Sequence, residues 1–87
     1  MIYQIIILDS AQKELNQLHP VDLKKIKKAI FSLANDPFPH GSLKLEATKE
    51  KLYRVRKGDY RIIYSVNHNI VTITILKITH RRDVYKF

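Results

Sequence analysis

Residues 52–66 read LYRVRKGDYRIIYSV, and this stretch decides the fold. Two runs rich in aromatic and β-branched residues flank Gly58-Asp59, a dipeptide typical of tight hairpin turns. Folding the chain on a two-residue turn at this point pairs Arg56 with Arg61 across two antiparallel strands. Arg54 falls on the same face, because side chains alternate between the two faces of a sheet. The stretch therefore predicts a β-hairpin with three arginines on one side.

The three arginines indicate a bound anion. Like charges that face each other across a sheet are destabilising, so folding alone does not explain why Arg56 stands opposite Arg61. Guanidinium groups stay charged and hold phosphate oxygens in a fixed fork. We therefore expect these arginines to bind phosphate, and we expect RNA to be the molecule that carries it. The alternative is that they are exposed arginines with no task in binding.

The net charge of +8 is unevenly distributed along the chain. Residues 1–50 contain seven basic and six acidic side chains, a balance of +1, whereas residues 51–87 contain nine basic and two acidic, a balance of +7. An asymmetry of this size is typical of proteins with a polyanionic partner. A solvated basic face or an acidic partner protein would also explain it.

The composition is that of one small globular domain. Eighty-seven residues can build one hydrophobic core, and 45% hydrophobic and 28% charged residues are ordinary values. The absence of cysteine excludes a disulfide framework and a thiolate metal site. The longest apolar stretch, within residues 2–8, is far shorter than the ~20 residues of a membrane span, and it lacks the features of a signal peptide. We expect a single cytoplasmic domain over residues 1–87 with no membrane contact.

The first half of the chain predicts a strand followed by two helices. Residues 2–8 form a nearly unbroken apolar run, which indicates a strand buried on much of both faces. Asp9, with Gln12 three residues later, matches a capping box for a short helix that ends near Leu18. Pro20 fits the first turn of a second helix, so the pair would form an αα-hairpin. The expected buried stripe of the second helix is Leu23, Ile26, Ile30 and Leu33.

The second half predicts a sheet. Residues 38–51 read as a loop, and strands follow near residues 52–57, 60–66 and 70–79. The expected fold class is therefore α+β: an N-terminal strand, an αα-hairpin and then a three-stranded antiparallel sheet.

The turn between the last two strands sets the second register. We expect a two-residue turn at His68-Asn69, because it gathers the apolar residues on one face. This register pairs Val66 with Val71, Tyr64 with Ile73 and Ile62 with Ile75. The helices should cover that face, which leaves the arginines open to solvent on the other.

Residues 80–85 read HRRDVY and form a second candidate cluster. The cluster combines the titratable imidazole of His80, two arginines and the ring of Tyr85, which can stack on a base. Strict alternation along the last strand would place His80 and Arg82, rather than Arg81, on the face that carries the other arginines. No histidine lies at a metal-ligand spacing, and two glycines are too few for a glycine-rich phosphate loop. We expect no metal and no other cofactor.

The order strand, αα-hairpin, loop and three strands resembles the RelE/ParE toxin superfamily of bacterial type II toxin–antitoxin systems. Residues 52–64, LYRVRKGDYRIIY, are similar to the signature of its RelE branch, and so is the ending HRRDVY. Lys44-Leu45 resembles the lysine-leucine pair that leads into the sheet in this family, although the glycine usual shortly afterwards is missing. The resemblance spans essentially the whole chain and implies the RelE-like toxin fold.

The resemblance implies a ribosome-dependent messenger RNA endonuclease. Such toxins enter the ribosomal A site and cleave the codon there, through attack of the ribose 2′-hydroxyl on the adjacent phosphate. By motif, Arg54 and Arg56 stand where the family has basic residues, and Arg61 matches its phosphate-stabilising arginine. Arg81 matches the arginine assigned to leaving-group protonation, and Tyr85 the aromatic residue that orients or stacks on the substrate. The implied partners are the ribosome with its messenger RNA and a RelB-type antitoxin, with DNA reached only through the antitoxin complex.

Two questions stay open. The first is the general base: arginine, with a pKa above 12, is a poor proton acceptor, whereas His80 has a suitable ordinary pKa and Tyr85 would need a lowered one. Positioning on the ribosome could also take the place of a base. The second is the function itself, for which a ParE-like inhibitor of DNA gyrase and a non-catalytic basic module that binds RNA or regulates transcription are the alternatives.

Overall fold

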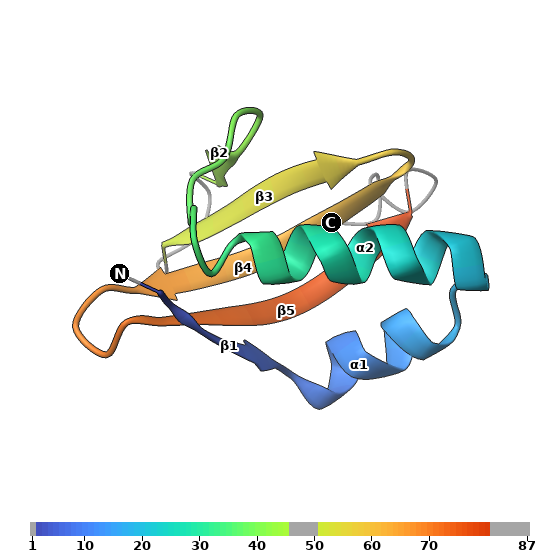
Figure 1. Ribbon diagram of the computed structural model, residues 1–87, viewed down its shortest axis with the longest axis horizontal. Helices are drawn as coiled ribbons and strands as arrows, with labels where there is room; N and C mark the ends of the chain where they lie inside the picture. The colour runs from blue at the N-terminus through green and yellow to red at the C-terminus, as the bar shows by residue number, and fades with distance from the viewer. Residues whose placement is uncertain (1, 46–50, 81–87) are drawn as a thin grey trace.

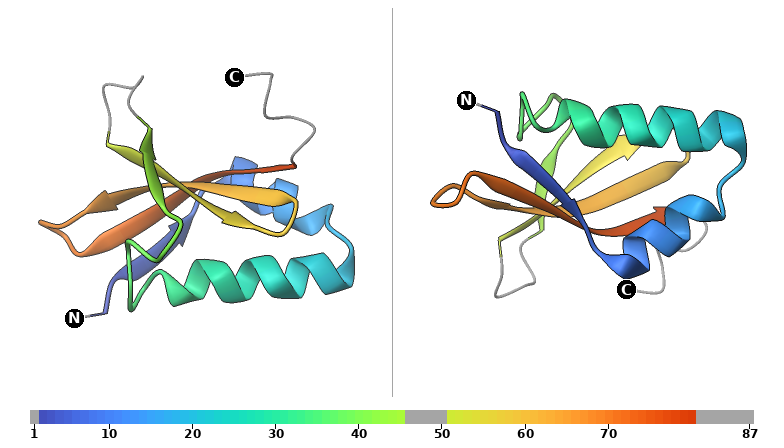
Figure 2. Two further views of the ribbon diagram at one scale, coloured as in Figure 1. Left: turned by 90° about the horizontal axis from the view of Figure 1, so that it is seen from above. Right: turned by 60° about the horizontal axis from the view of Figure 1, so that its bottom comes forward.

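The computed structural model describes residues 2–45 and 51–80, which form one mixed sheet with two helices (Figure 1). The elements in chain order are β1 (Gln4–Ile7), α1 (Asp9–Asn16), α2 (Pro20–Ser32), β2 (Leu43–Leu45), β3 (Leu52–Lys57), β4 (Tyr60–Asn67) and β5 (Thr72–His80). The strand order is β1-β5-β4-β3-β2. Helix α2 runs across one face of this sheet, and α1 packs beside β5 (Figure 2).

The α+β fold class is confirmed, but the sheet has five strands rather than three. The N-terminal strand joins the sheet as a parallel neighbour of β5, and β2 pairs with β3 inside the segment that reads as a loop. Strand β2 has only three residues, too few for a periodic pattern to reveal it. Strand β1 lies at an edge and is half-exposed, with Ile6 44% exposed, so the expectation that both of its faces are buried is wrong.

The register of the first hairpin is as predicted. Lys57 pairs with Tyr60, Arg56 with Arg61, Val55 with Ile62, and Arg54 with Ile63. Gly58 occupies the left-handed region at φ +59°, which glycine adopts without steric cost. This two-residue turn places Val55 and Ile62 under the helices and the arginines on the opposite side.

The register of the second hairpin differs from the prediction. Asn67 pairs with Thr72, so the connection holds the four residues 68–71 instead of two. The side-chain oxygen of Asn67 explains the longer turn, because it accepts the backbone N–H groups of Asn69 and Ile70 at 3.0 and 3.3 Å. As a result Tyr64 pairs with Ile75 rather than Ile73. The shift is two residues, so every apolar side chain in this part of the hairpin keeps its predicted face.

A β-bulge then resets the alternation of β5. Ile63 pairs with Lys77 whereas Tyr64 pairs with Ile75, which leaves Leu76 as one extra residue. Strand β1 pairs with β5 only as far as Ile75, and beyond that point α1 supplies the partners. The Glu14 carboxylate accepts the backbone N–H of Ile78 at 3.1 Å, a contact between residues 64 positions apart.

The helices begin differently from one another. Helix α2 starts at Pro20, as predicted, because proline suits the first helical position. Helix α1 starts at Asp9 with Leu8 as its N-cap and no side-chain cap, so the predicted capping box is wrong. The Gln12 amide instead donates to Asn16 one turn later.

Neither helix in the described part of the chain is long and apolar enough to cross a membrane.

The core lies between the helices and the sheet. Ile26, Ile30 and Leu33 of α2 are buried as predicted, with Leu23 packed at their margin. Fully burying a side chain of this kind contributes about 1.5–3 kcal/mol. Tyr64 is fully buried and its hydroxyl donates to the Pro37 carbonyl at 2.7 Å, which ties the segment after α2 to the centre of the sheet.

We predict that Tyr64→Phe removes part of the alkaline sensitivity of the fold. Burial raises the pKa of Tyr64 to about 12, above the ~10 of an unfolded tyrosine. The folded state therefore keeps a proton that the unfolded state loses, and stability falls as pH rises from about 10 to 12. Urea unfolding at a series of pH values should show a shallower fall for Tyr64→Phe, and about 1 kcal/mol lower stability at pH 7 because the Pro37 carbonyl loses its donor. Tyr53→Phe is the control, and parallel pH curves for Tyr64→Phe and wild type would contradict the prediction.

Candidate nucleic-acid interface

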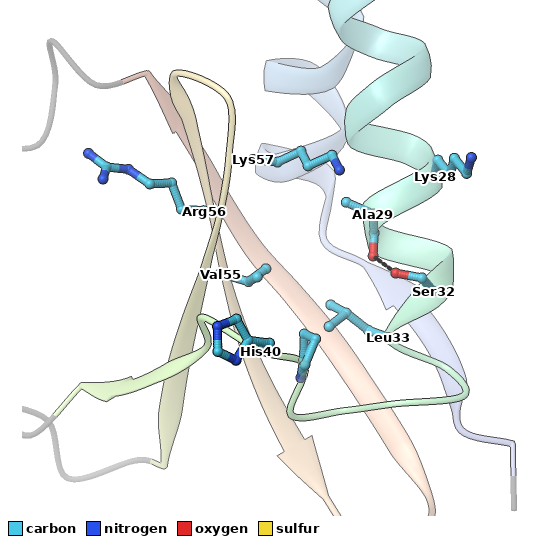
Figure 3. A pocket seen from close by; sticks show the side chains of 9 residues that line it. Lys28, Ala29, Ser32, Leu33, His40, Val55, Arg56 and Lys57 are labelled. Atoms are coloured by element: carbon cyan, nitrogen blue, oxygen red, sulfur yellow. Dashed lines mark hydrogen bonds between the residues drawn. The ribbon is translucent and has the colours of Figure 1, made fainter.

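The face of the sheet opposite α2 carries the predicted arginines in two rows. The first row crosses β3, β4 and β5 as Arg56, Arg61 and Thr79. The second row crosses the same strands as Arg54, Ile63 and Lys77. Figure 3 shows the side chain of Arg56 pointing away from α2, while that of Lys57 points toward the helix. We call these six residues the arginine face.

The arginine face concentrates positive charge over a small area. Adjacent strands lie about 4.8 Å apart, so Arg56 and Arg61 begin from closely spaced backbone positions. Arg56 is exposed, whereas Arg54 and Arg61 are half-buried, and Lys77 adds a further exposed cation. Partly desolvated guanidinium groups interact more strongly with an anion than fully hydrated ones do. The arrangement suits a phosphate group that lies over the first row.

The floor of this face is buried. Ile63 is 9% exposed and Thr79 is 3% exposed, although both point away from the helices. The hydroxyl oxygen of Thr79 has no hydrogen-bond partner within residues 2–45 and 51–80. Sequence reasoning missed Thr79 because strict alternation assigns it to the other face, and nothing in the local sequence marks the bulge that moves it.

The structure does not bring His80 to the arginine face. The same bulge pairs His80 with Tyr60, whose hydroxyl donates to Asp22 of α2 at 3.4 Å. The His80 and Tyr60 rings meet edge to face with centroids 5.0 Å apart, on the helix side of the sheet. The alternation that would put His80 beside the arginines is therefore wrong. Arg81, Arg82 and Tyr85 lie outside the described residues.

A separate cleft lies on the helix side, between α2, residues 39–40 and β3 (Figure 3). Its volume is about 290 Å³, and its lining includes the polar side chains of Lys28, His40 and Lys57 and the apolar side chains of Leu33 and Val55. Arg56 also borders this cleft, but its side chain points away from α2 (Figure 3). Among the described residues no group of three or more potential ligand side chains could hold a metal ion.

Comparison with known proteins identifies the family. The family model described as the ParE toxin of type II toxin–antitoxin systems, parDE, matches residues 5–85. The chain therefore belongs to the RelE/ParE superfamily of toxins from type II toxin–antitoxin systems.

The relatives compared within that superfamily are of the RelE type. The putative toxin RelE1 of Methanocaldococcus jannaschii is 34% identical over 88 residues, covering 99% of this chain and 98% of that protein. Toxin RelG of Mycobacterium tuberculosis is 28% identical over 87 residues, covering 99% of each. RelE in the archaeal RelE–RelB complex from Pyrococcus horikoshii OT3 superposes with a TM-score of 0.82 at 36% identity, covering 93% of this chain and 97% of that one. The resemblance to the RelE branch is thus confirmed.

We predict that neutralising Arg56 leaves the fold as stable as before or more stable. Arg56→Gln removes one of two like charges that face each other, which should raise stability by roughly 0.2–1 kcal/mol. Arg56→Lys keeps the charge and serves as the control. Thermal unfolding at low salt should rank the glutamine variant at or above the lysine variant, and added salt should shrink the difference. If Arg56→Gln is markedly less stable than both wild type and Arg56→Lys, then Arg56 has a structural role.

Proposed function

We propose that this chain is a ribosome-dependent messenger RNA endonuclease whose arginine face stabilises the charge at the scissile phosphate. The observation that carries the proposal is the direct pairing of Arg56 with Arg61 on the open side of the sheet. Like charges that face each other across a sheet are destabilising, and an anion bound between them would relieve that cost. The similarity of the chain to RelE-type toxins supports the choice of messenger RNA as the source of that anion.

The proposed reaction is cleavage through the ribose 2′-hydroxyl. The 2′-oxygen attacks the adjacent phosphorus and loses its proton, the bond from phosphorus to the 5′-oxygen breaks, and that oxygen gains a proton. The products are a 2′,3′-cyclic phosphate and a 5′-hydroxyl. Negative charge accumulates on the phosphorane oxygens, where guanidinium donors of Arg56 and Arg61 would stabilise it more than in the ground state. Removing one such donor typically costs about 10²–10³ in rate.

Proton transfer does not require a conventional base in this proposal. Arginine holds its proton too tightly to accept another at neutral pH, and His80 lies beside Tyr60 on the opposite side of the sheet. Alignment of the 2′-hydroxyl with the phosphate by the ribosome would supply much of the acceleration. From the family resemblance we assign leaving-group protonation to Arg81 and substrate stacking to Tyr85.

The proposed protein partner is a RelB-type antitoxin. The relative from Pyrococcus horikoshii OT3 forms a RelE–RelB complex, and a net charge of +8 favours an acidic partner that shields the basic surface. Contact with DNA would occur only through that antitoxin. Action on translating ribosomes would take place in the cytoplasm.

A second candidate is inhibition of DNA gyrase. The name of the matching family model, ParE toxin, favours it, since the same fold serves both branches of the superfamily. The two functions differ in their products, because only the endonuclease would cleave messenger RNA at codons.

We predict codon-located cuts that depend on the ribosome. The purified protein is incubated with naked messenger RNA and with programmed ribosomes, and the cuts are mapped by primer extension. Cleavage should require ribosomes, and Arg61→Ala should lower the single-turnover rate by about 10²–10³. Lys24→Ala, on the exposed side of α2, is the matched control and should cleave like wild type.

Two outcomes would contradict the proposal. Equal cleavage rates on naked and on ribosome-bound RNA would show that cleavage does not depend on the ribosome. Gyrase inhibition without any RNA cuts would favour the second candidate.

A further inference from the structure

Two buried threonines on β5 differ in how their hydroxyl groups are satisfied. Thr72 is 5% exposed, and its Oγ1 donates to the Ile70 carbonyl at 2.9 Å. Thr79 is 3% exposed, and its Oγ1 has no hydrogen-bond partner in the described part of the chain. Thr72 therefore has a structural reason to be threonine, whereas packing alone does not explain Thr79.

An unpartnered buried hydroxyl is unfavourable, because it has left water without gaining a new hydrogen bond. Valine has a similar size, suits a β-strand well and carries no hydroxyl, so it would fill this position without that loss. The presence of threonine therefore points to a partner outside the described residues, and a bound ligand is one that this position can take.

The register shows where that partner would lie. Thr79 pairs with Arg61, and Arg61 pairs with Arg56, so the three side chains occupy one row of the arginine face. With strands about 4.8 Å apart, the backbone position of Arg61 lies between that of Arg56 on one side and that of Thr79 on the other. Phosphate is the ligand that matches this row, because several of its oxygens can accept hydrogen bonds at the same time.

We propose that Thr79 is a third phosphate ligand, whose Oγ1 donates a hydrogen bond to an oxygen of the phosphate held by Arg56 and Arg61. The proposal rests on the proposed function and adds to it a neutral donor on β5. Because the hydroxyl is covered in the free protein, neighbouring side chains must shift when the phosphate binds.

The test uses inorganic phosphate and four proteins. Phosphate is titrated at constant ionic strength into wild type, Thr79→Val, Thr79→Ser and Thr74→Val. Binding is followed by the amide chemical shifts in NMR spectra. Thr79→Val should weaken binding about tenfold, because it removes one hydrogen bond to a charged ligand. Thr79→Ser keeps the hydroxyl and should bind like wild type. Thr74→Val is the matched control, since Thr74 lies on β5 on the same side of the sheet but outside the two rows.

Thermal unfolding separates a ligand from a structural residue. Without phosphate, Thr79→Val should melt at or above the wild-type temperature, because an unpartnered hydroxyl has been replaced by a methyl group. A lower melting temperature for Thr79→Val than for Thr79→Ser would overturn the proposal, since it would show that the methyl-for-hydroxyl exchange breaks a contact of the folded state. Equal phosphate affinity of wild type and Thr79→Val would overturn it as well.

The phosphate titration also distinguishes this inference from the proposed function. If wild type fails to cut RNA on ribosomes but Thr79→Val still weakens phosphate binding, the nuclease proposal fails and the phosphate site stands. If wild type cuts RNA and Thr79→Val cuts and binds phosphate equally well, the nuclease proposal stands and Thr79 has no part in it.

Discussion

The register of the β3–β4 hairpin determines both faces of the sheet at once. The two-residue turn at Gly58-Asp59 sends Val55, Ile62 and Tyr64 into the core and Arg56 and Arg61 to the opposite side. A slip of one residue would exchange the two sets. Burial of three large side chains contributes about 1.5–3 kcal/mol each, whereas a facing pair of like charges costs at most about 1 kcal/mol. The core therefore holds the arginines together even though they repel each other.

The bulge at Leu76 gives the arginine face its third strand. Strand β1 is short, and its pairing with β5 ends at Ile75. Beyond that point, the Glu14 carboxylate of α1 accepts the Ile78 N–H group. The extra residue lets Ile78 remain in the core while Thr79 turns toward Arg61. It also moves His80 to the helix side, beside Tyr60. The register that places these two candidate residues thus lies where β5 contacts a helix far away in the sequence.

The parts of the fold that the sequence predicts correctly are those set by neighbours in the chain. A glycine-containing turn and strict alternation leave one reasonable register for the first hairpin, and the helical spacing of Ile26, Ile30 and Leu33 leaves one buried stripe for α2. The length of the second turn is harder to predict, because connections of two and of four residues leave the same side chains on each face of the sheet. The hydrogen bonds of the Asn67 side chain favour the four-residue connection. Neither β2 nor the bulge has a local signal. The predicted placement of Arg54, Arg56 and Arg61 on one face is accordingly correct, whereas the placement of Thr79 on that face is not predicted.

The most direct measurement is the position of a heavy phosphate analogue on the protein. Crystals soaked in tungstate would show the bound anion by its anomalous scattering. The pairing of Arg56 with Arg61 predicts a peak between these two side chains, on the side of the sheet away from α2. A peak confined to the cleft beside Lys28 and His40, with none near Arg61, would contradict the claim that the arginine face is the phosphate site.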